Sequence, residues 1–218
     1  MPLCIDFLRP VITGHKVNNI QATPLRGSDM AFRDHLAAAT IEKGEISLIH
    51  EMLEHSQSSN HAMTIFENIT ECPGHKSAIN MLTRDRLCAA IGIEPEAYID
   101  TLGWAMTNPS TPVLVNTDDA PCMENRAQEV DLNLIPIPHH WPADRGRYSS
   151  ASIIIAQNNG IRNVSFHRQF LRDTKHLVVR LVPRHLLTMV LTSLTAGREL
   201  SVAVVNAPHP ASLLPAST

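Results

Sequence analysis

Several well-known sequence signatures are missing from this chain. It contains no phosphate-binding P-loop, no Gly-x-Gly-x-x-Gly turn and no Gly-x-Ser-x-Gly nucleophile motif. These absences argue against the common nucleoside triphosphatases, dinucleotide-binding enzymes and serine hydrolases. No apolar run approaches the length that spans a bilayer, and no internal repeat is present. The function therefore has to be sought in less familiar patterns.

Cysteines are too few and too scattered to define a site, and the balance of charge indicates no basic surface. The four cysteines form no Cys-x-x-Cys pair, so neither a zinc knuckle nor a disulfide framework is predicted. The formal net charge of -3 argues against a nucleic-acid partner. The N-terminus lacks the pattern of a secretory signal. With 44% hydrophobic and 18% charged residues, we expect a soluble, cytoplasmic protein with reduced thiols, a real core and no membrane partner.

Turn and capping signals divide the first half of the chain. Residues 1–28 show no clear period, which predicts a disordered N-terminal extension or, alternatively, an added strand packed on the domain. Residues 29–115 are predicted to form a small α/β domain. Its expected elements are a helix at 30–39 that is complete before Gly44, strands at 46–49 and 62–66, and a helix at 84–91 capped by Thr83, ended by Gly92 and followed by a helix opened by Pro95.

The second half, residues 116–218, has a different texture. Short apolar runs predict strands at 152–156, 162–170, 177–182 and 200–205, and a helix at 185–196. Asn158-Asn159-Gly160 is a strong hairpin signal between the first two strands. Strands this close in sequence favour antiparallel pairing, in a sheet or a barrel with attached helices. The predicted fold class is therefore α+β.

The strand at 162–170 carries the densest group of polar side chains. Because side chains alternate along a strand, Asn163, Ser165, His167 and Gln169 are expected on one face. That row is either a binding face or an ordinary solvated face. Arg168 falls on the opposite face, where a buried guanidinium requires an anionic partner.

Two further segments are candidates for chemistry. Arg180, Arg184 and His185 lie at a predicted strand-to-helix junction, which suits a phosphate, although these residues could simply flank a turn. His139 and His140 are adjacent on an extended, proline-rich stretch, so their side chains point apart and are poorly placed to share a metal ion. That stretch is predicted to be a rigid connector.

In their order and spacing, these segments resemble the UbiD family of decarboxylases over residues 30–214. The matching segments are LIPIPHHWPADRGRY at 134–148, SIIIA at 152–156, RNVSFHR at 162–168 and RLVPRHL at 180–186, with FENI at 66–69 and PGH at 73–75 upstream. The resemblance implies a small N-terminal α/β domain (29–115), a split-β-barrel flavin-binding domain (116–218), and a C-terminal domain that is absent here.

The resemblance also implies an activity and its partners. Family members are carboxy-lyases that reversibly decarboxylate aromatic or α,β-unsaturated carboxylic acids without oxidation. They use prenylated FMN with a divalent metal, commonly Mn²⁺, and often K⁺. A flavin prenyltransferase supplies the cofactor, and the full-length enzymes are homo-oligomers. The form of the second motif favours a small acid as the substrate.

Individual residues are assigned by matching these motifs. Arg168 matches the catalytic arginine that faces the substrate carboxylate and pairs with glutamates. Asn163 and His185 match metal ligands, with a bulge or strong twist expected between Asn163 and Arg168. The positions matching cofactor contacts are Asn163, Ser165, Phe166, His167, Arg168, Arg180, Leu181, Val182, Arg184 and His185.

The chain departs from the family pattern at its C-terminal end. The glutamate that completes the metal site and the acids that deliver the proton have no counterpart in the sequence. We therefore expect a truncated domain that needs a complementary C-terminal polypeptide for activity. The alternatives are a flavin- or phosphate-binding module without catalysis, or an inactive fragment.

Overall fold

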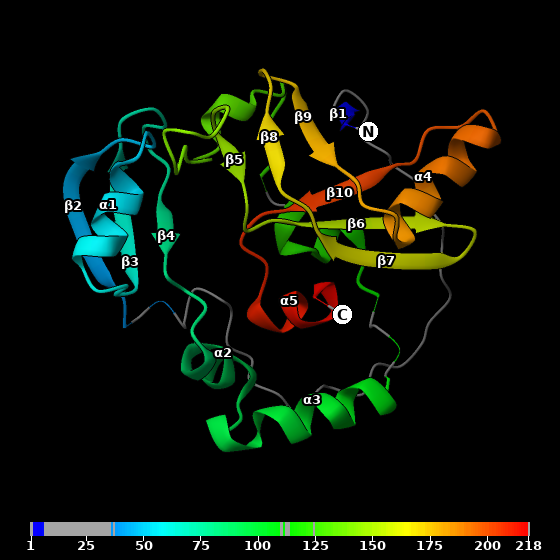
Figure 1. Cartoon of the computed structure of the whole chain (residues 1–218), viewed down its shortest axis with the longest axis horizontal. Helices are drawn as coiled ribbons and strands as arrows, with labels where there is room; N and C mark the ends of the chain where they lie inside the picture. The colour runs from blue at the N-terminus through cyan, green and yellow to red at the C-terminus, as the bar shows by residue number, and fades with distance from the viewer. Residues whose placement is uncertain are drawn as a thin grey trace.

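The computed structural model describes residues 2–6, 36, 38–109, 111, 114–123 and 125–217. In these residues the fold is a mixed α+β architecture with three small sheets (Figure 1). One sheet belongs to the N-terminal α/β unit, and the other two are built mainly from the second half of the chain. A split barrel is not identified among the described residues, so this finer part of the expected fold stays a prediction.

The N-terminal α/β unit is a three-stranded sheet with the order β2-β3-β4. Strands β2 (Thr40–Ile46) and β3 (Thr64–Ile69) pair in parallel, and β4 (Ser77–Ile79) pairs with β3 in the antiparallel sense. Parallel strands require a crossover, which helix α1 (Glu51–Ser58) provides. The helix and sheet enclose a core around Leu48, Met52 and Phe66, all of which are almost completely buried.

Several expectations for this unit are corrected. The strand predicted at 46–49 is misplaced, because β2 ends at residue 46, and Gly44 lies inside it, at an irregularity in the pairing with β3. Helix α1 was not predicted. Its N-cap residue, His50, makes no capping hydrogen bond with its side chain and has a φ of 68°. The usual capping signal is therefore missing. The helix predicted at 30–39 lies almost entirely outside the described residues.

The next helices agree closely with the sequence signals. Helix α2 (Arg84–Ile91) starts at Thr83, whose hydroxyl accepts a hydrogen bond from the backbone N–H of Arg86 at 3.3 Å. It ends at Gly92, which has the left-handed conformation (φ 72°) that glycine adopts without strain. A short 3₁₀ turn η2 (Pro95–Ala97) leads into α3 (Tyr98–Thr107).

The first part of the second half, residues 117–149, includes the proline-rich stretch and is part of the core as well as a connector. It contains the 3₁₀ turns η3 (Thr117–Asp119), η4 (Pro121–Met123) and η5 (Leu132–Leu134) and ends in strand β5 (Tyr148–Ser149). Leu132 and Ile137 are buried against Leu171 and Leu177. Their packing fixes this segment against the sheet that carries β5.

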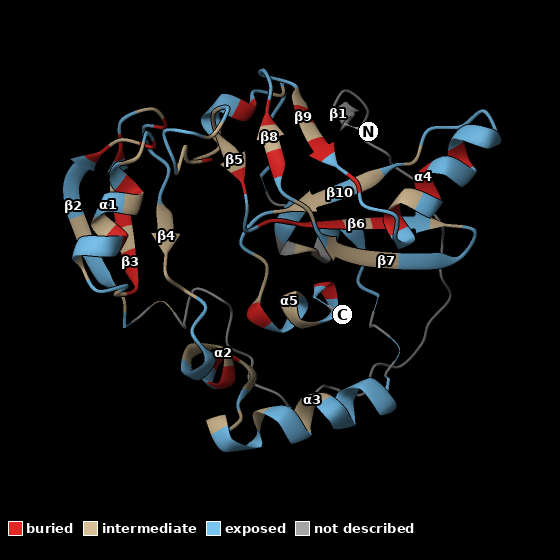
Figure 2. Cartoon of the chain, viewed as in Figure 1, coloured by how far each residue is buried: buried red, intermediate tan, exposed pale blue. Residues whose placement is uncertain are grey.

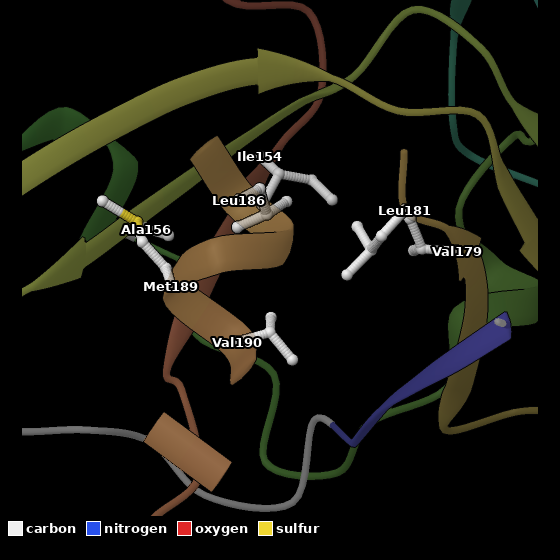
Figure 3. Close-up of a cluster of buried hydrophobic side chains, with 7 residues drawn as sticks. All are labelled: Ile154, Ala156, Val179, Leu181, Leu186, Met189 and Val190. Atoms are coloured by element: carbon white, nitrogen blue, oxygen red, sulfur yellow. The ribbon is translucent and has the colours of Figure 1, made fainter. Parts of the chain in front are cut away.

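The second unit contains a confirmed hairpin. Strands β6 (Ile153–Asn158) and β7 (Ile161–Phe166) pair in antiparallel fashion around Asn159 and Gly160, which both have positive φ, as a tight two-residue hairpin turn requires. Strand β10 (Val202–Val205) pairs with the other edge of β6. Helix α4 (His185–Thr195) covers this sheet, with its core formed by Ile154, Ala156, Val179, Leu181, Leu186, Met189 and Val190 (Figure 3).

The strand predicted at 162–170 is divided between two sheets. Its first part is β7, whereas its last residues form β8 (Gln169–Leu171), which pairs with β5 and β9 (His176–Arg180). Only His167 and Arg168 connect the two strands. Residues 2–6 form β1 (Pro2–Asp6) on the other edge of β9, so an added strand is found within the expected extension. Residues 7–28 lie outside the described residues.

Helix α5 (Pro210–Ala216) brings the halves of the chain together, since it lies against both α2 and β7 (Figure 1). Burial is concentrated in the sheets, whereas α3 contains no buried residue and is largely exposed (Figure 2). Within the described ranges, every helix is too short or too polar to cross a bilayer.

Candidate functional site

The polar side chains predicted on one face of the strand are linked to one another. The amide nitrogen of Asn163 donates to the hydroxyl of Ser165 at 3.0 Å, and His167 Nε2 lies 3.1 Å from the same hydroxyl. All three side chains are half-buried. The expected alternation is therefore confirmed over this stretch. Burial lowers the pKa of His167, opposed by a hydrogen bond with the Arg180 backbone.

Gln169 does not continue this row. It lies in β8, is completely buried, and donates from Nε2 to the hydroxyl of Ser152 at 2.7 Å. Ser152 in turn lies 2.7 Å from the hydroxyl of Ser149. Gln169 therefore belongs to a buried polar network between β5, β6 and β8. Strand alternation failed here because the chain changes sheets after Phe166.

Arg168 lies in the two-residue connection between β7 and β8. Its Nη2 donates to the Asp144 carboxylate at 2.6 Å, and its guanidinium carbon lies 4.1 Å from the centre of the Tyr148 ring. The side chain of Arg168 is 51% exposed and that of Asp144 is 16% exposed. The expected buried arginine is thus corrected to a half-exposed one, but its need for an anion is met by an acid upstream in the chain. The expected twist between Asn163 and Arg168 is present as a complete break between strands.

The second predicted segment surrounds the start of α4. Arg180 ends β9, Leu181 is buried in the core of Figure 3, and Val182 is exposed. Arg184 is the N-cap residue of α4 and His185 is its first residue, and both side chains are exposed. The Arg184 side chain makes no capping hydrogen bond, and the first turn contains no acid.

This arrangement of charge is unfavourable for the helix itself. The N-terminus of a helix carries a partial positive charge, so acidic residues normally stabilise the first turn. Here the cationic Arg184 stands at the N-cap position, and the first turn contains no acid. Neither Arg180 nor Arg184 forms an ion pair with an acid in the part of the chain that the structure describes. The uncompensated cations and the free N–H groups together are suited to an anion such as a phosphate.

The two segments meet through His167 and Arg180. The hydrogen bond between the His167 side chain and the Arg180 backbone places the polar row of β7 next to the end of β9. Helix α4 also packs on β6 and β7. Of the residues predicted to contact a phosphorylated cofactor, the structure thus brings His167 and Arg180 into direct contact.

The predicted metal site is not complete. Asn163 and His185 could offer an amide oxygen and an imidazole nitrogen to a divalent cation. However, the described residues contain no group of three or more His, Cys, Asp or Glu side chains that could hold a metal ion. The donor set present does not fit a fully coordinated metal, so no step of the chemistry is assigned to one.

Of the paired histidines in the proline-rich segment, His139 joins the two units of the fold. The backbone of His139 bridges to Ile49, and its ring lies 4.7 Å from the ring of His50 in the N-terminal unit. His139 Nε2 also contacts the backbone oxygen of Asp144 at 3.2 Å. Burial lowers the pKa of His140, an effect that Arg168 and His139 reinforce and the Asp144 carboxylate opposes.

Sequence reasoning missed Asp144 and Tyr148 as members of the site. Both belong to the segment Asp144-Arg145-Gly146-Arg147-Tyr148, in which the glycine was interpreted as part of a turn. The sequence did contain one indication, which is that the acidic Asp144 lies just before strand β5, in the motif that leads into the cofactor segment. Nothing in the local pattern indicates that this acid meets Arg168, which lies 24 residues further along the chain.

The comparison with protein families agrees with these features. Residues 113–218 match the family described as UbiD, 3-octaprenyl-4-hydroxybenzoate carboxy-lyase Rift-related domain. A protein of Archaeoglobus fulgidus named anhydromevalonate phosphate decarboxylase is 43% identical over 94 residues, which are 42% of this chain and 22% of that protein. A protein of the same name from Methanothermobacter thermautotrophicus is 28% identical over 184 residues, 83% of this chain and 42% of that protein.

Solved structures give the same result. The UbiD-class enzyme HmfF from Pelotomaculum thermopropionicum, in an evolved dimeric form in complex with prFMN, superimposes with a TM-score of 0.77 at 28% identity. The match covers 83% of this chain and 45% of that enzyme. Vanillic acid decarboxylase from Sedimentibacter hydroxybenzoicus in its closed form has the same TM-score at 17% identity over 86% of this chain and 44% of that one, which supports the fold alone.

Each of these matches covers only part of the relative's own length. The chain spans less than half the length of each of these relatives. The relatives themselves are carboxy-lyases of one family, and the matched region includes both segments that carry the candidate site. On the motifs, the fold and these comparisons together, the chain belongs to the UbiD family.

Proposed function

We propose that this chain forms the prenylated-FMN-binding part of a non-oxidative decarboxylase that acts on an aromatic or α,β-unsaturated carboxylic acid. The observation that carries the proposal is the pair of uncompensated arginines, Arg180 and Arg184, beside the N-terminus of α4. A buried or half-buried polar row next to an anion site is the arrangement that a phosphorylated, partly aromatic cofactor requires. The prFMN bound by HmfF supports this choice of cofactor.

The proposed role of each residue follows from its position. Arg180, Arg184 and His185 hold the phosphate, with the N–H groups of the first turn of α4. Asn163, Ser165 and His167 offer hydrogen-bonding groups along β7, and Phe166, Leu181 and Val182 add apolar contact. When bound, prenylated FMN supplies the electron sink for the electrons left as carbon dioxide departs. Arg168 binds and orients the substrate carboxylate.

The chemistry of the substrate follows from that last contact. An exposed guanidinium recognises a carboxylate through two parallel hydrogen bonds. These bonds orient the carbon–carbon bond that breaks when carbon dioxide leaves. The relatives named anhydromevalonate phosphate decarboxylase favour a small phosphorylated unsaturated acid over an aromatic one. We propose that class as the first to be assayed.

Other parts of the proposal concern the complete enzyme. A flavin prenyltransferase supplies the cofactor, and a complementary polypeptide supplies the acids for proton transfer. The assembled enzyme is a homo-oligomer, a choice supported by the evolved dimeric form of HmfF, and its flavin-binding region forms the expected split barrel. The Mn²⁺ and K⁺ expected from the family stay predictions, because the described donor groups do not complete a metal site.

The test is cofactor binding by the full 218-residue chain, co-expressed with a flavin prenyltransferase and measured by native mass spectrometry and absorbance. The variant Arg184→Gln removes a charge that contacts the phosphate. Loss of one charge-assisted hydrogen bond costs about 1.5–3 kcal/mol, so we expect the affinity to fall at least about tenfold.

The matched control is Arg198→Gln. Arg198 is also exposed and follows the C-terminal end of the same helix. Its substitution changes the net charge by the same amount, but at the end of α4 opposite to the proposed phosphate site. Equal affinity losses for the two variants would contradict a phosphate site at the N-terminus. Binding without carbon dioxide release, even with the complementary polypeptide present, would favour a flavin-binding module without catalysis.

A further inference from the structure

The arginine assigned to the substrate carboxylate is held in place by one segment of the chain. Arg168 has five N–H donors, and its Nη2 donates to Asp144 at 2.6 Å. One face of its guanidinium plane lies over the ring of Tyr148 at 4.1 Å. A carboxylate is bound at the edge of the guanidinium fork, so stacking on the ring leaves that edge available.

Asp144 is itself fixed by the backbone around it. Its N–H donates to the backbone oxygen of Trp141 at 2.9 Å, and its own backbone oxygen lies 3.2 Å from His139 Nε2. The Arg168 guanidinium keeps the pKa of the Asp144 carboxyl below its usual range, so the group is ionised at neutral pH. The carboxylate therefore presents a fixed negative charge at one end of the Arg168 side chain.

The support continues into the N-terminal unit. The backbone N–H of His139 donates to Leu48 at 2.8 Å, and the N–H of His50 donates to the His139 oxygen at 2.9 Å. Leu48 is completely buried in the core of that unit. A continuous path of short contacts thus connects the N-terminal sheet to the turn that carries Asp144.

We infer that Asp144 is a positioning residue that aims the Arg168 guanidinium at a bound carboxylate, with His139 anchoring its turn to the N-terminal unit. This inference rests on the proposed function for the identity of the ligand, but the orientation of Arg168 can be measured without it. A free arginine side chain samples many rotamers, and ordering it on binding weakens the affinity. An arginine already held by Asp144 and Tyr148 avoids most of that loss.

The experiment follows the guanidinium N–H groups of Arg168, among them the Nη2 group that donates to Asp144, by NMR in the full chain. In the unsubstituted protein we expect a resolved signal with slow hydrogen exchange. The variant Asp144→Asn keeps the size of the side chain and both backbone contacts but removes the charge. We expect hydrogen exchange at Arg168 to become at least about tenfold faster, while Asp144→Glu, which retains the charge, restores most of the protection.

A matched control is Glu67→Gln, which breaks the ion pair between Glu67 and Lys76 in the N-terminal unit, away from the site. It should leave the Arg168 signal unchanged. A second variant, Tyr148→Leu, keeps Asp144 and removes the ring, and we expect an intermediate increase in exchange. Unchanged exchange in both Asp144→Asn and Tyr148→Leu would overturn the positioning role.

Titration with sodium crotonate, a small unsaturated carboxylate, separates this inference from the proposed function. A shift of the Arg168 signal that needs about tenfold more crotonate in Asp144→Asn supports both. If crotonate does not shift the signal in the unsubstituted chain, the carboxylate-binding role of Arg168 is overturned. The exchange comparison then decides the role of Asp144 independently.

Discussion

At the scale of single residues, three arginines show three different uses of the same side chain. Arg147 donates to the backbone oxygens of Ile137 and Ile135 at 2.7 and 2.9 Å, so it holds the proline-rich segment in shape. Arg168 has one acidic partner and a half-exposed side chain. Arg184 has no acidic partner among the described residues and lies where a helix disfavours a cation. The less an arginine is satisfied within the fold, the stronger the case for a ligand.

The half-buried His140 predicts how stability depends on pH. Because burial lowers its pKa, the folded chain binds fewer protons than the unfolded chain below the usual histidine pKa of 6.5. Above about pH 6.5 the ring is neutral in both states and costs no stability. As the pH falls below that value, the unfolded chain takes up the proton first, so the free energy of unfolding decreases. The pKa of His167 is lowered in the same direction and contributes to the same window.

The variant His140→Gln removes one of these titrations. We expect the urea midpoint to fall less between pH 7.5 and pH 5.5 in this variant than in the unsubstituted protein, with Asp144, Arg168 and His139 as the charged or titratable neighbours in both. The same substitution at the exposed His75 is the matched control. An unchanged fall in the midpoint for His140→Gln would show that this ring does not couple folding to pH.

At the scale of elements, the sequence predicted best where local interactions decide the structure. Thr83 and Gly92 marked both ends of α2, and Asn159-Gly160 marked the β6–β7 hairpin. A cap or a tight turn is determined by a few neighbouring residues, so its signal is present in the sequence. Helix α1 has no such signal at its N-terminus, and it was missed for that reason.

The cap of α2 can be tested directly. Replacing Thr83 by Ala leaves the N–H of Arg86 without its side-chain partner and should cost about 1 kcal/mol of stability. For a chain of this size that corresponds to a decrease in Tm of roughly 2–4 °C. Thr83→Ser keeps the hydroxyl and should melt close to the unsubstituted protein. Equal melting of the Ala and Ser variants would mean that water replaces the cap without cost.

The division of the strand at 162–170 could not be predicted in the same way. The sequence alternates through Phe166 as one strand would, but Gln169 pairs with Val179 and Ser149 in a different sheet. The choice of sheet depends on partners far away in the sequence, which periodicity does not report. The same limit applies to Asp144 and Arg168, so the cofactor segments were assigned from motifs whereas the partner of the arginine required the fold.

At the scale of the whole molecule, distant segments complete the architecture. Strand β1 pairs with β9 across most of the chain length, and α5 lies against both α2 and β7. The proline-rich segment, predicted to be a connector, also joins the N-terminal core to the turn of Asp144. The residues of the candidate site all come from the second half of the chain, but the turn that carries Asp144 is anchored to the N-terminal unit through His139, a contact that the sequence did not indicate.

Helix α3 is the exception to this integration. It contains no buried residue, and Ile99, Trp104 and Met106 are 65%, 65% and 71% exposed (Figure 2). Large apolar side chains exposed together favour association between molecules. Side chains this exposed, such as Trp104 and Met106, contribute almost nothing to the stability of the isolated chain.

The double variant Trp104→Gln, Met106→Gln tests that statement. We expect the free energy of unfolding to stay within about 0.5 kcal/mol of the unsubstituted value, as for most surface changes, and the binding of a hydrophobic dye to decrease. The contrasting variant is Met52→Ala in α1, which removes a side chain only 2% exposed and should cost about 2–5 kcal/mol. Comparable losses from the two variants would mean that α3 is packed against another surface in solution, because only side chains that leave water on folding can cost that much when they are removed.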